Sequence, residues 1–104
     1  MSNQVILIGR IVNEPKIDSD TKNCEITIAI NRAFKNEDGI YETDFIPVTL
    51  KGTIATNVVE YCKKGDLVGV KGRLQTNTYE NEDGEKKRII EVIADKVTFL
   101  SSKN

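Results

Sequence analysis

The chain has 104 residues, of which 38% are hydrophobic and 30% charged, and its 15 basic and 16 acidic side chains leave a net charge of −1. This length and composition predict one globular domain over residues 1–104 and exclude a disordered chain, while the near-zero charge gives no general attraction to nucleic acid or to an anionic membrane. The apolar runs are far too short to span a bilayer, and the N-terminus lacks the basic flank and long apolar stretch of a signal peptide, so we expect a cytoplasmic protein.

The first half of the chain predicts three strands. Residues 4–12 are β-branched and aliphatic, and residues 24–32 alternate with isoleucines on one face. Residues 45–51 also alternate, which places one row of side chains in the core and directs Phe45 outward. Because Pro47 cannot donate a backbone hydrogen bond, we expect this third strand to meet a sheet edge or a bulge there.

A change of period in "GTIATNVVEYCKKG" predicts one short helix. The apolar residues that recur at helical spacing are Ile54, Val58, Tyr61 and Cys62. We place Thr53 as the N-cap and Gly65 as the C-cap of this helix. Lys63 and Lys64 would then lie at the negative end of the helix dipole.

Two further strands follow the helix. Residues 66–75 and 88–100 both have strand patterns, and the second is unusually long. Gly69 and Gly72 interrupt the first of them, which indicates bending or the close approach of another backbone.

The tetrapeptide Asn-Glu-Asp-Gly occurs twice, at residues 36–39 and 81–84, each time between two predicted strands. Asp-Gly favours a turn because glycine adopts a positive φ without steric cost and Asp tolerates one. We therefore interpret the duplication as two independent hairpin turns and not as an internal repeat. Acidic side chains cluster around these tips, whereas basic side chains lie in or beside the strands, which predicts positive charge on the sheet.

The order of elements is three strands, one short helix and two more strands. This order predicts an all-β fold, a five-stranded Greek-key barrel of the OB fold with the helix between strands 3 and 4. A β-sandwich would need about seven strands and leaves no place for the helix. In the barrel, the long hairpins joining strands 2 to 3 and 4 to 5 would project as two arms.

Four of the six aromatic side chains lie near the polar tips: Phe34, Tyr41, Phe45 and Tyr79. One hypothesis is that unpaired bases stack on them while nearby Lys and Arg follow the phosphates, which suits binding that is independent of base sequence. The alternative is that they make cross-strand or barrel-closing contacts and that the charges form a solvated face. The pattern alone leaves both open.

Several segments occur in an order that is specific as a whole. They are "NQVILIGRIVNEP", "AINRAF", "TDFIPVTLKG", "VVEYCKKGDLVGVKGRLQTNTYEN" and "EVIADKVTFL". From residue 3 to residue 100 this succession resembles the bacterial single-stranded DNA-binding protein family, including its phage and plasmid members. The resemblance implies an OB fold, a homotetramer, and the coating of single-stranded DNA during replication, recombination and repair in the nucleoid. It implies neither enzymatic activity nor a cofactor.

The resemblance also assigns site residues. It implies that Phe34, Phe45 and Tyr79 are the stacking aromatics, and Tyr41 is added from its position on the same arm. Lys51 stands where the family commonly has a fourth aromatic, which exchanges a stack for a phosphate contact. The cations predicted to contact phosphates are Arg10, Arg32, Lys35, Lys51, Lys64, Lys71 and Arg73. Members usually continue into an acidic tail that recruits other proteins, and because this chain stops at "FLSSKN", no tail-mediated partner is predicted.

Two rival classes remain. The first is an OB-fold interaction module, such as a replication-restart accessory subunit, which the low number of aromatics and the net charge favour. Exposure of Phe34, Phe45 and Tyr79 in a groove would separate it from a DNA-binding protein. The second is an enzyme, but the chain has no His and no phosphate-binding glycine loop. Cys24 and Cys62 are too far apart for a metal knuckle and too few for a disulfide framework, so we expect two core thiols and no metal.

The first strand predicts self-assembly. It is apolar on both faces at Val5, Ile6, Leu7 and Ile8. Only one face of a strand can point into a small barrel, so the other needs a cover. Closed symmetry with further copies supplies that cover without forming fibres. The resemblance implies the form, in which dimers joined through their first strands pair into a tetramer.

Overall fold

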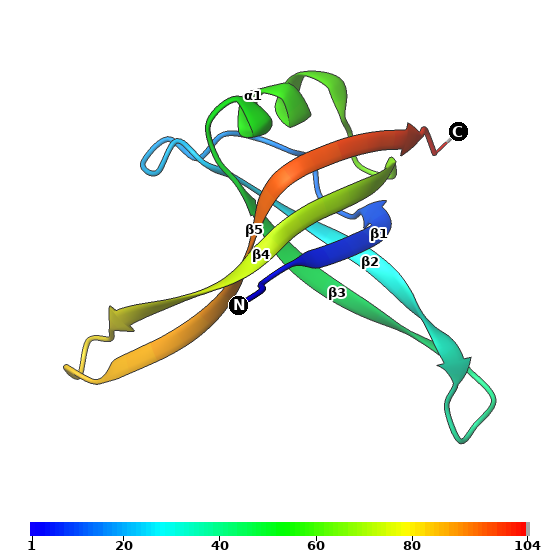
Figure 1. Cartoon of the computed structure of the whole chain (residues 1–104), viewed down its shortest axis with the longest axis horizontal. Coiled ribbons are helices and arrows are strands. Elements are labelled where there is room, and N and C mark those ends of the chain that lie inside the picture. The colour runs from blue at the N-terminus through cyan, green and yellow to red at the C-terminus, as the bar shows by residue number, and fades with distance from the viewer. Residues whose placement is uncertain (104) are drawn as a thin grey trace.

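The computed structural model describes residues 1–103, which fold into a five-stranded barrel with one helix (Figure 1). The elements are β1 (Val5–Ile11), β2 (Cys24–Lys35), β3 (Tyr41–Leu50), α1 (Gly52–Tyr61), β4 (Leu67–Glu80) and β5 (Lys86–Ser101). The strands close in the order β1-β2-β3-β5-β4, which confirms the predicted all-β OB fold. Within the described residues, no helix has the length and apolar character needed to cross a membrane.

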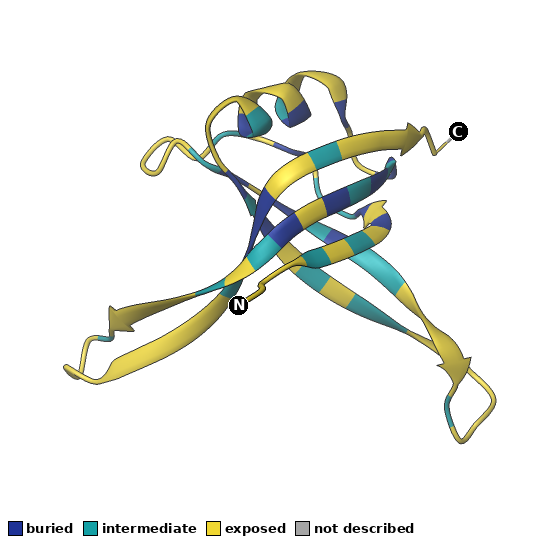
Figure 2. Ribbon diagram, viewed as in Figure 1, coloured by how far each residue is buried: buried dark blue, intermediate teal, exposed yellow. Residues whose placement is uncertain are grey.

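The core fills the barrel and continues beneath α1 (Figure 2). Its strand residues include Ile11, Cys24, Ile26, Ile28, Val48, Leu50, Val68, Val70, Val92 and Ala94. Ala55 and Val58 of α1 join the same cluster. Burying each Val, Leu or Ile side chain contributes about 1.5 to 3 kcal/mol. Both cysteines are free and buried as predicted, and desolvation raises the pKa of each thiol.

Strand pairing is uneven around the barrel. β1 pairs with β4 from Val5 to Arg10, but its register with β2 covers Arg10 and Ile11. β3 pairs with β5 in parallel at Val48 and Thr49. Pro47 lies immediately before this pairing begins, so its strand meets a sheet edge there, as expected.

The start of α1 corrects the predicted cap. The helix begins at Gly52, and Lys51 occupies the N-cap position without a side-chain cap hydrogen bond. Gly52 has a φ of 59°, a conformation that glycine adopts readily and β-branched residues avoid. The chain therefore turns into the helix before it reaches Thr53, which is not the N-cap.

The end of α1 also differs from the prediction. The helix stops at Tyr61, whose side chain is 69% exposed, and Cys62 is already extended with its side chain in the core. Gly65 is therefore not the C-cap. It lies in a following turn, at a φ of 97°, and donates its N–H to the Ile11 carbonyl at 2.7 Å. The buried Asp66 carboxylate accepts a hydrogen bond from the backbone N–H of Lys63 at 2.9 Å. Lys63 and Lys64 therefore lie in this turn and not in the last turn of the helix.

The two long hairpins extend beyond the barrel as arms (Figures 1 and 2). We define arm 1 as residues 31–43 of the β2–β3 hairpin and arm 2 as residues 75–91 of the β4–β5 hairpin. All four strands are longer than predicted because their outer halves are polar and carry no alternating apolar pattern.

The two tips form the same turn. In each, the side-chain oxygen of the Asn accepts hydrogen bonds from backbone N–H groups two and four residues later, at 2.9 to 3.0 Å. Gly39 and Gly84 complete the turns at φ values of 77° and 80°. The interpretation as two independent hairpin turns is confirmed. Asn36 and Asn81 organise them, a role that the Asp-Gly argument missed.

The β4–β5 ladder has a bulge just inside the root of arm 2. The β4–β5 register shifts after Lys71, so Asp95 is skipped and Gly72 faces Ala94. A Cβ on Gly72 would stand 2.1 Å from the Ile93 carbonyl oxygen, so only glycine fits there. Gly69, by contrast, has room for a Cβ, with its nearest neighbouring atom at 3.8 Å. The bending or close approach predicted for the two glycines therefore occurs at position 72, where the Ile93 backbone lies close.

Candidate nucleic-acid interface

All four predicted stacking aromatics are exposed. Phe34 is 85% exposed, Phe45 63%, Tyr41 55% and Tyr79 49%. They come from the two arms and from the part of β3 that joins arm 1 to the barrel. None of the four belongs to the core cluster, so barrel-closing contacts do not describe their position, whereas Tyr41 does make a cross-strand contact, with Lys35.

One face of β3 presents a row of these side chains. Strand side chains alternate, so Tyr41, Phe45 and Thr49 point to the same side. Across the ladder, Phe45 faces only Ala29, whose short side chain leaves the aromatic ring uncovered. A flat ring above small neighbours is suited to stacking against a planar base.

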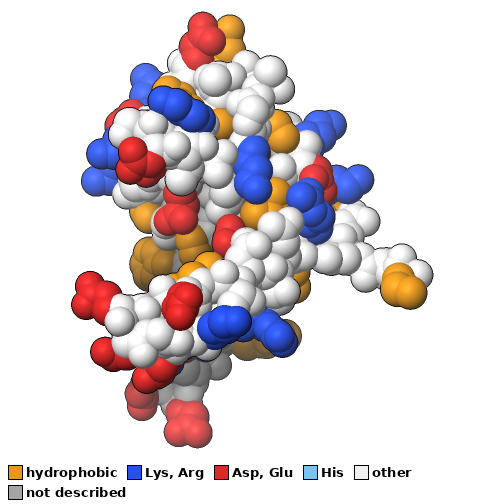
Figure 3. All heavy atoms as spheres, turned by 90° about the vertical axis from the view of Figure 1, so that its left-hand side faces the viewer, with side chains coloured by type: hydrophobic (Ala, Val, Ile, Leu, Met, Phe, Trp, Pro, Cys, Tyr) orange, Lys and Arg blue, Asp and Glu red, His pale blue; other side chains and the backbone are white. Residues whose placement is uncertain are grey.

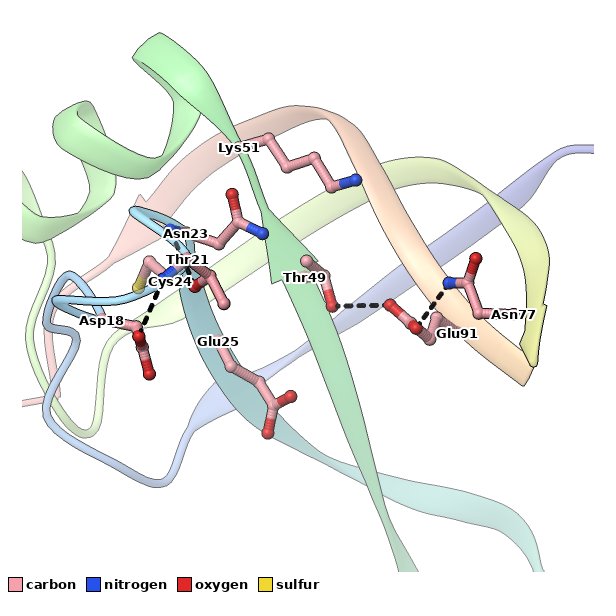
Figure 4. Close-up of a pocket in the computed structure, with 9 residues that line it drawn as sticks. All are labelled: Asp18, Thr21, Asn23, Cys24, Glu25, Thr49, Lys51, Asn77 and Glu91. Carbon is pink, nitrogen blue, oxygen red and sulfur yellow. Dashed lines mark hydrogen bonds between the residues drawn. The ribbon is translucent and has the colours of Figure 1, made fainter. Parts of the chain in front are cut away.

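Arm 2 joins this face through Glu91. Its carboxylate accepts hydrogen bonds from Asn77 Nδ2 at 2.6 Å and from Thr49 Oγ1 at 3.4 Å, as Figure 4 shows. Tyr79 lies two residues beyond Asn77 on the same strand and therefore on the same face of the arm. The outward face of β3 and the Tyr79 face of arm 2 are thus continuous.

Phe34 lies in a bulge. Asn31 pairs with Thr43 and Lys35 with Tyr41, so three β2 residues stand opposite one residue of β3. Alternation therefore does not assign the Phe34 ring to either face. Its high exposure leaves it free to meet a ligand.

A hollow of about 430 Å³ lies at the barrel end of the continuous face (Figure 4). Lys51 stands on its wall, and three carboxylates line it: Asp18, Glu25 and Glu91. The Asp18 carboxylate accepts hydrogen bonds from the backbone N–H groups of residues 20 and 21, within its own loop. These hydrogen bonds lower the pKa of Asp18. Sequence reasoning missed Glu91, although it is the one acid within the apolar stretch "IIEVIA".

Arg32 is paired with two carboxylates on arm 1. Its guanidinium binds Asp44 at 2.9 Å and Glu42 at 2.6 Å. The hydrogen bond and charge of Arg32 lower the pKa of Asp44. Both carboxylates alternate with Tyr41 and Phe45 along β3, so this cluster lies on the opposite face of the arm.

Two more of the predicted arginines are also held by the protein. Arg73 binds Asp95 at 2.7 Å beside the bulge, and Arg10 donates to the Gly65 carbonyl at 3.0 Å. Figure 3 shows a group of acidic side chains around the hairpin ends at the bottom of that view, with further acids and cations mixed over the rest of that side.

The predicted lysines occupy different places. Lys51 stands at the hollow, and Lys35 places its Nζ 5.7 Å from the centre of the Tyr41 ring. Lys64 lies in the turn after α1, and Lys71 faces Lys96 on the outside of the barrel. The structure therefore brings two of the four lysines to the aromatic face.

Sequence reasoning missed a cationic run on arm 2. Lys86, Lys87 and Arg88 open β5, and Lys87 stands directly opposite Tyr79 in the ladder. Side chains directly opposite in a strand pair share a face, so Lys87 lies beside the exposed ring. The three cations are consecutive in the sequence, but they follow directly after the acidic residues of the tip, and the segment was therefore interpreted as acidic.

The predicted oligomer face divides into two rows. Ile6 and Ile8 are 68% and 58% exposed, whereas Leu7 packs against the core and Val5 is half-buried. The two exposed isoleucines line an apolar hollow of about 340 Å³ together with Leu100. Unpaired apolar surface of this kind is suited to contact with another protein surface.

Comparisons with known proteins give a consistent result. The model of the Single-strand binding protein family matches residues 2–100. The chain is 48% identical to Single-stranded DNA-binding protein 1 of Clostridium acetobutylicum, over 97% of this chain and 96% of the relative. It is 43% identical to Single-stranded DNA-binding protein B of Bacillus subtilis, over 99% of this chain and 94% of the relative.

Solved structures show the same likeness. The Plasmodium falciparum SSB in complex with ssDNA superimposes with a TM-score of 0.80 at 26% identity, covering 97% of this chain and 96% of that one. The mitochondrial single-stranded DNA binding protein Rim1 of S. cerevisiae gives 0.73 at 21% identity, covering 98% and 99%, and this second match reports on the fold alone.

Proposed function

We propose, because the chain belongs to the Single-strand binding protein family, that it binds and protects single-stranded DNA without reading its sequence. Its role would be that of the family, in replication, recombination and repair in the cytoplasmic nucleoid. The 104 residues would act as one DNA-binding domain, by binding alone and without catalysis.

The continuous aromatic face is the observation that carries this proposal. Phe45 and Tyr79 are exposed on surfaces that Glu91 joins, and Tyr41 extends the row along arm 1. Every base has a π-face, so rings of this kind hold any sequence. Exposed rings also suit protein contacts, so it is the lysines beside these rings that favour a nucleic acid over a protein partner.

Lysines next to these rings would contact the phosphates. Lys35 stands over Tyr41, Lys87 opposite Tyr79 and Lys51 at the hollow. A strand that stacks its bases on the rings turns its backbone toward such side chains. Arg32, Arg10 and Arg73 would contribute less, because their guanidinium groups already bind acceptors within the protein. Lys64 and Lys71, away from the aromatic face, would act only on a strand that continues around the barrel.

Assembly into a homotetramer would extend the site. The Ile6 and Ile8 face is apolar and uncovered in one protomer, and a second copy can cover it by closed symmetry. Sedimentation at micromolar concentration tests this, and a folded, soluble monomer of 11.6 kDa would overturn it. The expected assembly gives a long DNA strand several barrels to contact, which raises its avidity.

The function is tested by titrating the protein with single-stranded and duplex DNA of equal length and following fluorescence anisotropy. We expect clear preference for the single strand and little difference among base compositions. Equal or stronger binding to the duplex would contradict the proposal, because bases paired in a duplex cannot stack on the rings.

A further inference from the structure

Arm 2 presents Tyr79, and β3 pairs with β5 only at the root of the arm. β5 has β3 as a second neighbour where Val92 faces Val48 and Ile93 faces Thr49. Outward from that pairing the arm is a two-stranded ribbon, and such ribbons twist and bend more easily than wider sheets. Glu91 is the first residue of β5 beyond the pairing.

Glu91 connects three strands at this place. From β5, its carboxylate accepts a hydrogen bond from Asn77 on β4 at 2.6 Å, which is the short distance of a charge-assisted bond. It also accepts one from Thr49 on β3 at 3.4 Å, which is long and therefore weaker. Figure 4 shows both bonds on one side of the hollow, at the root of the arm.

The charge of Glu91 does not explain its presence there. A carboxylate beside the path of a polyanion repels the phosphates, so by charge alone it would weaken binding. Its two partners, however, each share a face with a stacking ring: Thr49 with Phe45, and Asn77 with Tyr79. The Asn77 bond lies within arm 2 and links Glu91 to the strand that carries Tyr79. The Thr49 bond instead joins the arm to the face of β3 that carries Phe45.

We propose that Glu91 is a positioning residue, which fixes arm 2 relative to β3 so that Phe45 and Tyr79 engage one DNA strand together. This inference rests on the proposed function for its effect on binding. The bracing of the arm can be measured without DNA.

The test compares Glu91→Ala with Glu91→Gln. The Gln side chain keeps an oxygen that accepts the Asn77 N–H and an amide that can donate to the Thr49 hydroxyl, whereas Ala keeps neither. We expect Glu91→Ala to bind a short oligothymidylate about tenfold more weakly, within the range for one lost stack, and Glu91→Gln to stay within about twofold of the unaltered protein.

Glu85→Ala is the matched control. It removes the same charge from the same hairpin, at a side chain whose ion pair with Lys87 is long, at 4.0 Å. We expect equal or slightly tighter binding for this variant. The contrast with Glu91→Ala separates loss of the brace from loss of a negative charge.

Two further measurements isolate the positioning role. In the Tyr79→Ala background, Glu91→Ala should cost much less affinity than it does alone, because the ring that it positions is already absent. In the free protein, amide hydrogen exchange of arm 2 should be faster in Glu91→Ala and unchanged in Glu91→Gln.

Three results would overturn the inference. They are unchanged or increased affinity of Glu91→Ala, equal losses in the Ala and Gln variants, and unchanged hydrogen exchange in the arm of Glu91→Ala. If the unaltered protein bound no single-stranded DNA, the proposed function would fail by itself, while exchange in the free protein would still support or refute the brace.

Discussion

The two arms begin with the same tip and end in different roots. Both turns have the sequence Asn-Glu-Asp-Gly and the same hydrogen bonds. Arm 1 joins the barrel through a three-against-one bulge and an exposed cluster of Arg32 with two carboxylates. Arm 2 is held at its root from several sides, and identical tips therefore say little about how firmly a hairpin is oriented.

The contacts at the root of arm 2 come from distant parts of the chain. Glu91 reaches β3, and Arg73 binds the bulged Asp95. On the opposite edge of β4, the Asn3 side chain accepts the Leu74 N–H at 2.9 Å and donates to the Leu74 carbonyl at 2.7 Å. A root braced in this way should present its aromatic ring at a lower entropic cost than arm 1 does.

The largest expected effect is on stability, at the bend of arm 2. Gly72→Ala should lower the free energy of unfolding by about 3 kcal/mol, because the added Cβ meets the Ile93 carbonyl. Gly69→Ala in the same strand is the control and should change it by less than about 1 kcal/mol. Urea denaturation measures both, and equal values would remove the special role of the bend.

The next effect compares the rings of the two arms. Tyr79→Ala should cost about 1 to 3 kcal/mol of binding free energy with the fold intact, and Phe34→Ala should cost less, since its root is held less firmly. Tyr61→Ala removes an exposed ring on α1 and should leave affinity unchanged. If Phe34→Ala proves as costly as Tyr79→Ala in a fluorescence titration, bracing does not decide how much a ring contributes.

A smaller effect separates free from paired cations. Lys51→Ala should flatten the slope of log K against log salt by about 0.7, the increment for one lost single-strand phosphate contact. Arg32→Ala should change that slope less, because Glu42 and Asp44 already neutralise the guanidinium. Lys51→Phe should recover affinity with a weaker salt dependence, and an unchanged slope for Lys51→Ala would remove this residue from the site.

The smallest effect is the pH dependence of arm 1. The pKa of Asp44 is lowered by Arg32, so the pair stabilises the fold above the ordinary pKa of an Asp side chain, and this contribution is lost as pH falls through the lowered pKa. Asp44→Asn should therefore melt below the unaltered protein at neutral pH, and the difference should close in acid. If the difference in melting temperature persisted at a pH below both the ordinary and the lowered pKa of Asp44, the difference would not come from the ion pair with Arg32.

Sequence patterns predicted the barrel well because its core alternates. Ile26, Ile28, Val48 and Leu50 are buried where period 2 places them, and the helix lies between the expected strands. The outer halves of the strands were missed because polar ribbon residues bury nothing and leave no periodic signal. The N-cap was misplaced because the chain turns at Gly52, and the C-cap because a tertiary turn held by Asp66 and Gly65 follows the end of the helix.

The candidate site was predictable in part. The aromatics could be found because rings near polar tips are unusual, and they are exposed. Which cations are free could not be read from the sequence, since Arg32 and Lys35 are equally basic there and only pairing distinguishes them. Glu91 and Asn77 meet across a strand pair, and no local pattern reports such a contact.

The seam between β1 and β4 has a consequence for how the molecule forms. Each arm hairpin can form from its own turn outward. The seam between β1 and β4 instead joins Val5 to Gly72, which requires closing a loop that contains β2, β3 and α1. Local contacts form faster than distant ones, so we expect the seam to close last. Until then the newly made chain carries two finished hairpins with open edges, and such edges pair readily with other chains. The acidic side chains at both tips would then repel other copies of the chain and limit aggregation during folding, an effect separate from the function of the folded barrel.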